Sequence, residues 1–348
     1  MSRSGNGEVG HETRVTALHV WPDAAAGARC SGGDLHGDDR RAAGSAYGTP
    51  PADDNCDHSG EVLGTVWRSR MGSESTRWRR DEDHAPSGVD TSTPSPARIY
   101  DYMIGGKDHF AVDRAIGDKL MADNPLVRAT MASNRRFLTR AVRYCAQQGV
   151  RQFLDIGTGL PTADNVHQVA ARHAPGSSVV YTDNDPIVLA HARALLADET
   201  TGQGRTVIID ADLREGADLL RRPEVRDVLD LTEPVALLLV AVLHFVADAD
   251  RPHDLVAALL AELPPGSHLV LTHGTGDVLP QEADEAGRAY RNASERLFLR
   301  SGPEIARFFD GVELVEPGLT WTTRWRPDPA VPEDDLPGVY AGVARTAG

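Results

Sequence analysis

From residue 150 onward, short apolar segments alternate with segments of helical periodicity, and this alternation most narrows the folds open to the chain. The expected strands are 152–156, 178–182, 206–209, 235–242, 268–273, 312–315 and 339–344. The expected helices between them are about 162–172, 186–196, 223–229, 254–262, 282–300 and 304–309. Segment 235–242 is almost continuously aliphatic, as in a parallel strand buried on both faces. Repeated strand–helix units with right-handed crossovers predict an α/β fold with a doubly wound sheet.

The part of the chain before residue 150 divides into two regions of different composition. Residues 1–93 are rich in Gly, Ser, Asp, Arg and Pro and carry few periodic apolar positions, which predicts a disordered extension. Residues 94–149 show three helical stretches, beginning at Pro96, near Val112 and near Val127, and Gly149 supplies a stop. We therefore expect an extension (1–93), a helical cap (94–149) and a Rossmann-like domain (150–348).

The first expected strand ends in a glycine turn. Asp155 closes the apolar run, and Gly157 and Gly159 follow it, separated by Thr158. Glycine lets backbone approach a ligand closely because it has no Cβ. Since ligands of open α/β sheets bind at the carboxyl ends of the strands, this turn is the first candidate for a binding site.

Acidic residues end three neighbouring expected strands. These residues are Asp155, Asp183 and Asp212. A carboxylate after the second strand, about twenty residues beyond a glycine turn, is suited to accept hydrogen bonds from both ribose hydroxyls. We therefore expect Asp183 to bind an unphosphorylated ribose; the alternative role, capping the next helix, suits Asp185 before Pro186 better. Asp212 is expected to accept from the adenine amino group, the alternative being an exposed turn.

The glycine turn disfavours a phosphate ligand. Pro161 and Thr162 stand where a dinucleotide fingerprint would have its third glycine, and the chain has no Gly-Lys-Ser/Thr phosphate loop. An acidic crevice instead suits a ligand with ribose, adenine and positive charge. S-adenosylmethionine has all three and is the predicted cofactor.

Composition excludes several other classes of function. The net charge of −15 disfavours a general nucleic-acid binder, which needs surplus Lys and Arg to neutralise phosphates. The three cysteines, Cys30, Cys56 and Cys145, show no disulfide or zinc spacing, so no metal is expected. No run of eighteen apolar residues and no signal-peptide core is present, which predicts a cytoplasmic protein without membrane spans.

Several motifs resemble a known family in their order along the chain. They are Leu-Asp-Ile-Gly-Thr-Gly (154–159), Tyr-Thr-Asp-Asn-Asp-Pro (181–186), Asp-Ala-Asp-Leu (210–213) and Leu-His-Phe (243–245). These resemble the motifs of class I S-adenosylmethionine-dependent methyltransferases. The opening segment 94–110, Pro-Ser-Pro-Ala-Arg-Ile-Tyr-Asp-Tyr-Met-Ile-Gly-Gly-Lys-Asp-His-Phe, more narrowly resembles an actinobacterial methyltransferase family long catalogued as a domain of unknown function. The resemblance covers about 94–346 and implies a seven-stranded sheet whose last strand runs antiparallel.

The resemblance also implies which residues surround the cofactor. The implied positions are Asp155, Gly157, Thr158 and Gly159 at the methionine part, Asp183 at the ribose, Asn184 beside the adenine, Asp212 and Leu213 at the adenine edge, and Val240 to His244 on the methyl-transfer side. His244 is either a base or substrate contact or a structural histidine of a buried strand end. Tyr102, with Lys107 and His109, belongs to the cap signature. The cap either closes over the cofactor as a lid or contributes Tyr102 only to packing.

The expected reaction is methyl transfer to a small-molecule acceptor, which requires mainly alignment and desolvation. His244 and Tyr102 are the candidate catalytic residues. Two alternatives remain open from the residues: a non-catalytic module that binds S-adenosylmethionine, and an NAD-dependent oxidoreductase on a similar sheet.

Overall fold

The computed structural model describes residues 90–198, 204–331 and 334–347. The predicted extension lies outside the described residues except for its last four positions. Cys30 and Cys56 lie outside them as well, whereas Cys145 is a buried free thiol. None of the described helices is both long enough and apolar enough to cross a membrane.

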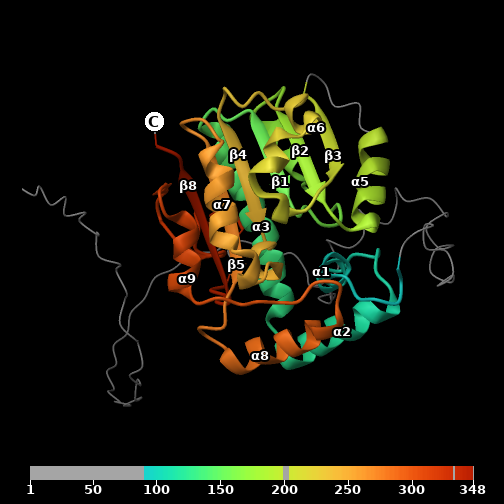
Figure 1. The fold of residues 1–348 in the computed structure, drawn as a ribbon. Helices are drawn as coiled ribbons and strands as arrows, with labels where there is room; N and C mark the ends of the chain where they lie inside the picture. The colour runs from blue at the N-terminus through green and yellow to red at the C-terminus, as the bar shows by residue number, and fades with distance from the viewer. Residues whose placement is uncertain (1–89, 199–203, 332–333, 348) are drawn as a thin grey trace, which may run out of the picture. The chain divides into compact units, whose positions relative to one another are not determined.

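The fold is built on one mixed sheet (Figure 1). Its strands are β1 (Gln152–Ile156), β2 (Ser178–Asp183), β3 (Thr206–Asp210), β4 (Val235–Val240), β5 (His268–Gly274), β6 (Glu313–Leu314), β7 (Thr320–Trp321) and β8 (Val339–Arg345). The strand order is β3-β2-β1-β4-β5-β8-β6, and β7 pairs with β8. The first five strands are parallel, and β8 runs antiparallel to β5. The predicted doubly wound sheet with an antiparallel last strand is confirmed; the two-residue β7 is an addition that no periodicity signalled.

Helices fill the connections. The α-helices are α1 (Pro96–Met103), α2 (Ala111–Asp123), α3 (Val127–Gln147), α4 (Val166–His173), α5 (Pro186–Asp198), α6 (Pro223–Arg226), α7 (Pro252–Ala261), α8 (Pro280–Ala289) and α9 (Gly302–Ala306). The 3-10 helices are η1 (Leu213–Arg221), η2 (Leu243–Phe245), η3 (Asp248–Asp250), η4 (Tyr290–Asn292) and η5 (Arg307–Phe309).

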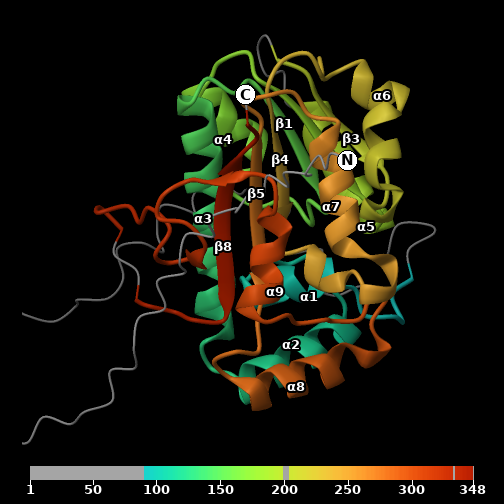
Figure 2. The ribbon, with the colours of Figure 1, turned by 60° about the vertical axis from the view of Figure 1, so that its left-hand side comes forward.

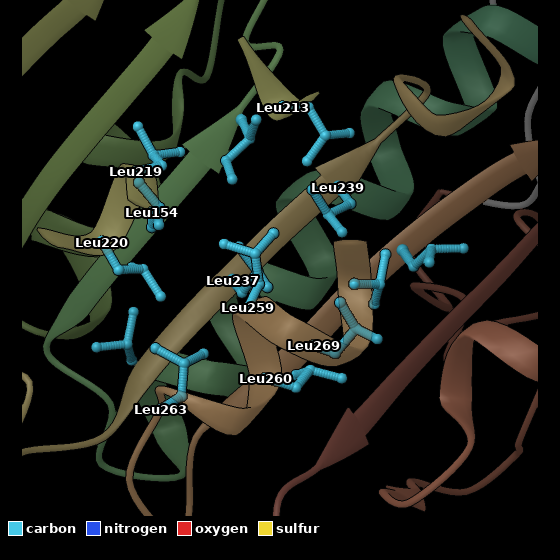
Figure 3. Packing of buried hydrophobic residues seen from close by; sticks show 14 of the residues in the cluster. Leu154, Leu213, Leu219, Leu220, Leu237, Leu239, Leu259, Leu260, Leu263 and Leu269 are labelled. Carbon is cyan, nitrogen blue, oxygen red and sulfur yellow. The ribbon is translucent and has the colours of Figure 1, made fainter. Parts of the chain in front are cut away.

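Alternate residues of the strands point to opposite faces and build two cores. On one face, Leu237 and Leu239 of β4 pack with leucines of η1 and α7, as Figure 3 shows. On the other face, Ala236 and Leu238 pack with α3 and α4. Because both faces are covered, β4 is buried along almost its whole length, as its aliphatic sequence predicts.

The cap lies at one end of the sheet, where α1, α2 and α8 group together in both views (Figures 1 and 2). Helix α3 extends from this group into the domain. Its later turns, including Phe137 and Val142, are buried against the sheet, whereas Met131 packs with Ile99 and Met103 of α1. The cap is therefore anchored to the sheet by a continuous helix.

Several predicted elements have other bounds: the helix expected at 162–172 begins at Val166, the helix expected at 223–229 ends at Arg226, and the strand expected at 312–315 is limited to Glu313–Leu314. Two further differences follow from specific backbone features. The helix expected at 282–300 ends at Ala289, because the following backbone makes tertiary hydrogen bonds: the Ser294 N–H donates to the Pro94 carbonyl (2.8 Å) and the Phe298 N–H to the His244 carbonyl (2.7 Å). The strand expected at 235–242 ends at Val240, because Ala241 takes a positive φ of 57° and turns the chain.

Candidate functional site

A pocket of about 320 Å³ lies between the cap and the carboxyl ends of the parallel strands. Residues that follow β1, β2, β3, β4 and β5 form its floor, and residues of α1, α3 and α8 form its other walls. The glycine turn and the ends of the first three strands therefore open into the same space as the cap.

Three predicted carboxylates meet in this pocket. Asp155, Asp183 and Asp212 all line it, although they come from three strand ends. Asp155 and Asp183 are 5% and 8% exposed. Their positions follow from the register, because parallel pairing aligns the ends of β1, β2 and β3 at one edge.

The glycine turn is held against the end of β2. The Gly157 N–H donates to the Thr182 carbonyl (2.8 Å), and the Gly159 N–H donates to Asp183 Oδ2 (2.9 Å). Both glycines have positive φ, 71° and 68°. A Cβ on Gly157 would lie 2.5 Å from Val242, whereas a Cβ on Gly159 would meet no atom within 4 Å. Gly159 thus exposes bare backbone to the open pocket.

Burial dominates the electrostatics of the two inner carboxyls. It raises the pKa of Asp155 to about 6, although the Arg135 guanidinium and a hydrogen bond from Thr158 Oγ1 (3.1 Å) act in the opposite direction. It also raises the pKa of Asp183 to about 6, against hydrogen bonds from the backbone of Asp185 and Gly159. A cationic ligand would favour the ionised form of both.

Asp185, not Asp183, caps the following helix, since Asp185 Oδ1 accepts from the Ile187 N–H (2.9 Å). Asp183 Oδ1 accepts from the Asp185 N–H (2.9 Å), so each oxygen of Asp183 holds one backbone amide. A carboxylate offers about four acceptor sites. Asp183 therefore keeps capacity for ligand donors.

Asp212 is more heavily engaged. Its carboxylate accepts from the Arg214 N–H (2.8 Å), from Arg214 Nη1 (2.9 Å) and from Asn184 Nδ2 (2.8 Å). Its side chain is about one third exposed. Asn184 and Leu213 line the pocket beside it. Leu213 is the first residue of η1, and the first amides of a helix have no partner within the helix. The Leu213 N–H is therefore a hydrogen-bond donor at this wall of the pocket.

His244 and Val240 line the pocket at the end of β4. His244 Nδ1 accepts a long hydrogen bond from the Gly274 N–H (3.3 Å). Burial, assisted by the Arg300 guanidinium, lowers the pKa of His244 to about 3, so the ring is neutral at physiological pH. With Nδ1 as acceptor, the single proton of the neutral ring sits on Nε2, which makes Nε2 a hydrogen-bond donor.

The expectation for Tyr102 needs correction. Its hydroxyl donates to Asp118 Oδ1 (2.6 Å), and its ring covers Gly117 of α2, outside the pocket lining. Tyr102 follows Asp101 on α1 and shares no face with Tyr100, which does line the pocket. Lys107 and His109 also lie outside the lining. The cap reaches the pocket through other residues of the same signature segment, among them Tyr100, Asp101 and Met103.

Sequence reasoning left two pocket residues of α3 unassigned. Arg135 lies near Asp155 and donates to Thr162 Oγ1. Asn134, 2% exposed, donates through Nδ2 to the Tyr100 hydroxyl (3.1 Å), which itself donates to the Met131 carbonyl (2.9 Å). Asn134 Oδ1 is therefore a buried acceptor without a partner among the described residues. The only feature of the sequence that could have indicated a role for these residues is that they are polar side chains on an amphipathic helix.

Arg300 is 5% exposed. It donates to the carbonyls of Leu243 (3.0 Å) and Val246 (2.8 Å) and to Asp248 (2.6 Å). It therefore fixes the segment after β4 that carries His244. Among the described residues, no group of three His, Cys, Asp or Glu side chains is arranged to hold a metal ion.

Comparison with known proteins agrees with this geometry. The family model described as S-adenosyl methyltransferase matches residues 82–347. A DUF574 family protein from Streptomyces avermitilis is 45% identical, with a TM-score of 0.70 over 74% of this chain and 99% of that chain. A Thermobifida fusca protein attributed to the methyltransferases is 39% identical, with a TM-score of 0.69 over 76% of this chain and 98% of that chain. The search of curated proteins gave no match.

Proposed function

The chain belongs to the S-adenosyl methyltransferase family, whose cofactor is S-adenosylmethionine, and we propose that it methylates a small-molecule acceptor. The observation that carries this proposal is the continuity of the pocket. One continuous pocket joins the carboxylates over β1–β3 to an apolar region over β4 and β5. A donor and an acceptor could meet side by side there, as methyl transfer by alignment requires.

The nucleoside part of the cofactor fits the first three strand ends. Asp183, with acceptor capacity left beside its two backbone amides, would accept from the ribose hydroxyls. The Leu213 N–H and the remaining capacity of Asp212 would meet the adenine edge, with Asn184 beside the ring. The bare backbone at Gly159 leaves room for the ligand to approach.

The methionine part of the cofactor carries a positive ammonium group and a negative carboxylate, and each needs a partner of opposite charge. Asp155, buried beside the glycine turn, would balance the ammonium, and Arg135, which forms no ion pair within the described part of the chain, would bind the carboxylate. This placement extends the sequence prediction, since it adds a cation from the cap helix to the residues of the glycine turn.

S-adenosylmethionine supplies an electrophilic methyl group, so the chain needs chiefly to align the acceptor and exclude water. The cap would exclude water, since residues of α1 and α3 form the wall opposite the strand ends. His244 would orient the acceptor by donating a hydrogen bond from Nε2. It would not remove a proton from the acceptor, because Nε2 already carries the single proton of the neutral ring.

Calorimetry on the full chain tests the cofactor assignment. S-adenosylmethionine and S-adenosylhomocysteine should bind with a stoichiometry near one, and NAD should give no heat. Saturable NAD binding would favour the oxidoreductase alternative. Incubation with trideuteromethyl-labelled S-adenosylmethionine and a panel of small acceptors then separates an enzyme from a binding module, because only an enzyme yields a mass-labelled product.

A further inference from the structure

The region of the pocket over β4 and β5 is lined mainly by apolar side chains, and we name it the acceptor compartment. Its walls include Met131, Phe245, Ala286, Tyr290 and Leu297, which also pack together in one apolar cluster. The Phe245 ring lies 4.6 Å from the His244 ring and 5.6 Å from the Tyr290 ring. These walls fit a compact, largely apolar molecule.

Cations for an anionic acceptor are missing from this compartment. Among the described residues, the lining of the entire pocket includes two arginines, Arg135 and Arg214, and no lysine. Arg135 lies beside Asp155 at the glycine turn. Arg214 pairs with Asp212 (2.9 Å), Asp250 (3.4 Å) and Glu295 (2.8 Å), so its charge is already matched. A carboxylate or phosphate would lose its hydration here without gaining a counter-ion.

Carboxylates, in contrast, are abundant around the pocket. Those that line it are Asp101, Asp123, Asp155, Asp183, Asp185, Asp212, Glu282 and Glu295. Glu282, in the first turn of α8, has no ion-pair or hydrogen-bond partner within the described residues. Asn134 Oδ1 adds a buried acceptor that also has no donor there. The unmatched polar groups thus accept hydrogen bonds and attract positive charge.

We propose that the acceptor is an apolar small molecule with a basic nitrogen, that Glu282 selects its cationic form, and that the methyl group goes to another nucleophilic atom of the molecule, because the protonated nitrogen has no lone pair. This inference rests on the proposed function, since it assigns the compartment beside the cofactor to the methyl acceptor. An amine supplies both missing features, N–H donors and positive charge, and its carbon skeleton fits the apolar walls.

Matched probes test this inference on the full chain saturated with S-adenosylhomocysteine. Tryptamine and 2-phenylethylamine are cationic, indole-3-propionate and 3-phenylpropionate are their anionic counterparts, and 2-phenylethanol is neutral. In calorimetric titrations we expect at least one amine to bind about tenfold more tightly than its carboxylate counterpart. Glu282→Gln should remove most of this preference and leave the affinity for 2-phenylethanol unchanged.

The control is Asp284→Asn, which removes a charge from an exposed position of the same helix outside the pocket lining. It should leave the preference intact. The inference is overturned if neither amine binds, if the carboxylates bind as well as the amines, or if Glu282→Gln keeps the preference. Failure of S-adenosylhomocysteine itself to bind would instead refute the proposed function, so the two failures are distinguishable.

Discussion

Replacing Asp183 by asparagine tests the assignment of the ribose site most directly. The carboxylate accepts one backbone amide on each oxygen, from Gly159 and from Asp185. Asparagine keeps the shape but has one acceptor oxygen, so its NH₂ group must face one of these amides or the ligand. A hydrogen bond to a charged group contributes about 1.5–3 kcal/mol. Losing about one such bond to the ribose should cost about 1.5–3 kcal/mol.

That cost corresponds to a loss of roughly 10- to 150-fold in affinity for S-adenosylhomocysteine, measured by calorimetry at pH 7.5. Adenosine and 2′,3′-dideoxyadenosine, compared in competition with S-adenosylhomocysteine, isolate the ribose contribution. The Asp183→Asn variant should lose affinity for adenosine but bind the dideoxy compound as the original protein does. An equal loss for both nucleosides would show that the carboxylate acts only by holding the glycine turn, and no loss for either would remove Asp183 from the site.

Three further outcomes follow from the same geometry. Arg135→Gln should weaken S-adenosylhomocysteine binding about tenfold while leaving 5′-methylthioadenosine, which lacks the carboxylate, unaffected in calorimetry. The raised pKa values of Asp155 and Asp183, both about 6, mean that the folded chain holds protons that the unfolded chain releases between about pH 4 and 6. Cofactor affinity should therefore fall as the pH drops below 6, whereas the contribution of these two carboxyls to the free energy of unfolding should grow as the pH falls from 7. Calorimetric titrations in buffers of different ionisation enthalpy should show that protons are released when the cofactor binds. Absence of proton release near pH 6 would contradict the assignment. Gly157→Ala should lower the free energy of unfolding by about 1–3 kcal/mol, because a Cβ there strains a positive φ and lies 2.5 Å from a valine side chain. Gly159→Ala, at a similar φ but facing open space, should lose less stability in thermal unfolding and more cofactor affinity.

The sheet was predictable because its signals are local. Strand β1 was expected over its observed length, and β2, β3 and β5 differ from expectation by one residue each. Aliphatic runs bounded by Gly, Pro and Asp define such strands without tertiary information. The segment after α8 was not predictable in this way. Its sequence has helical periodicity, but its amides bind Pro94 and His244, and partners so distant in sequence leave no local pattern.

The floor of the candidate site was predictable for the same reason, since it consists of residues that end strands. The opposite wall was not. Tyr102 and Tyr100 stand two residues apart on α1, and Tyr102 was expected at the site because it belongs to the cap signature. In the fold, α2 covers that position, so Tyr102 bonds Asp118 while Tyr100 reaches the pocket. Which face of a cap helix is covered depends on the packing of its neighbours, which periodicity does not contain.

Helix α3 connects this wall to the sheet and thereby constrains how the pocket could open. Residues such as Phe137 and Val142 on its later turns are fully buried against the sheet, so moving them would expose core. Arg135, which lies near Asp155, and Asn134, which bonds Tyr100, stand immediately before that anchored part and so hold fixed positions. Helix α2 contacts both α1 and α8, and α1 and α2 also contact α3. We therefore expect any opening for ligand exchange to involve α1, α2 and α8 and not the anchored part of α3. On the proposed assignment, we therefore expect the cofactor end of the pocket to be preformed and the acceptor end to be the part that adapts to different molecules.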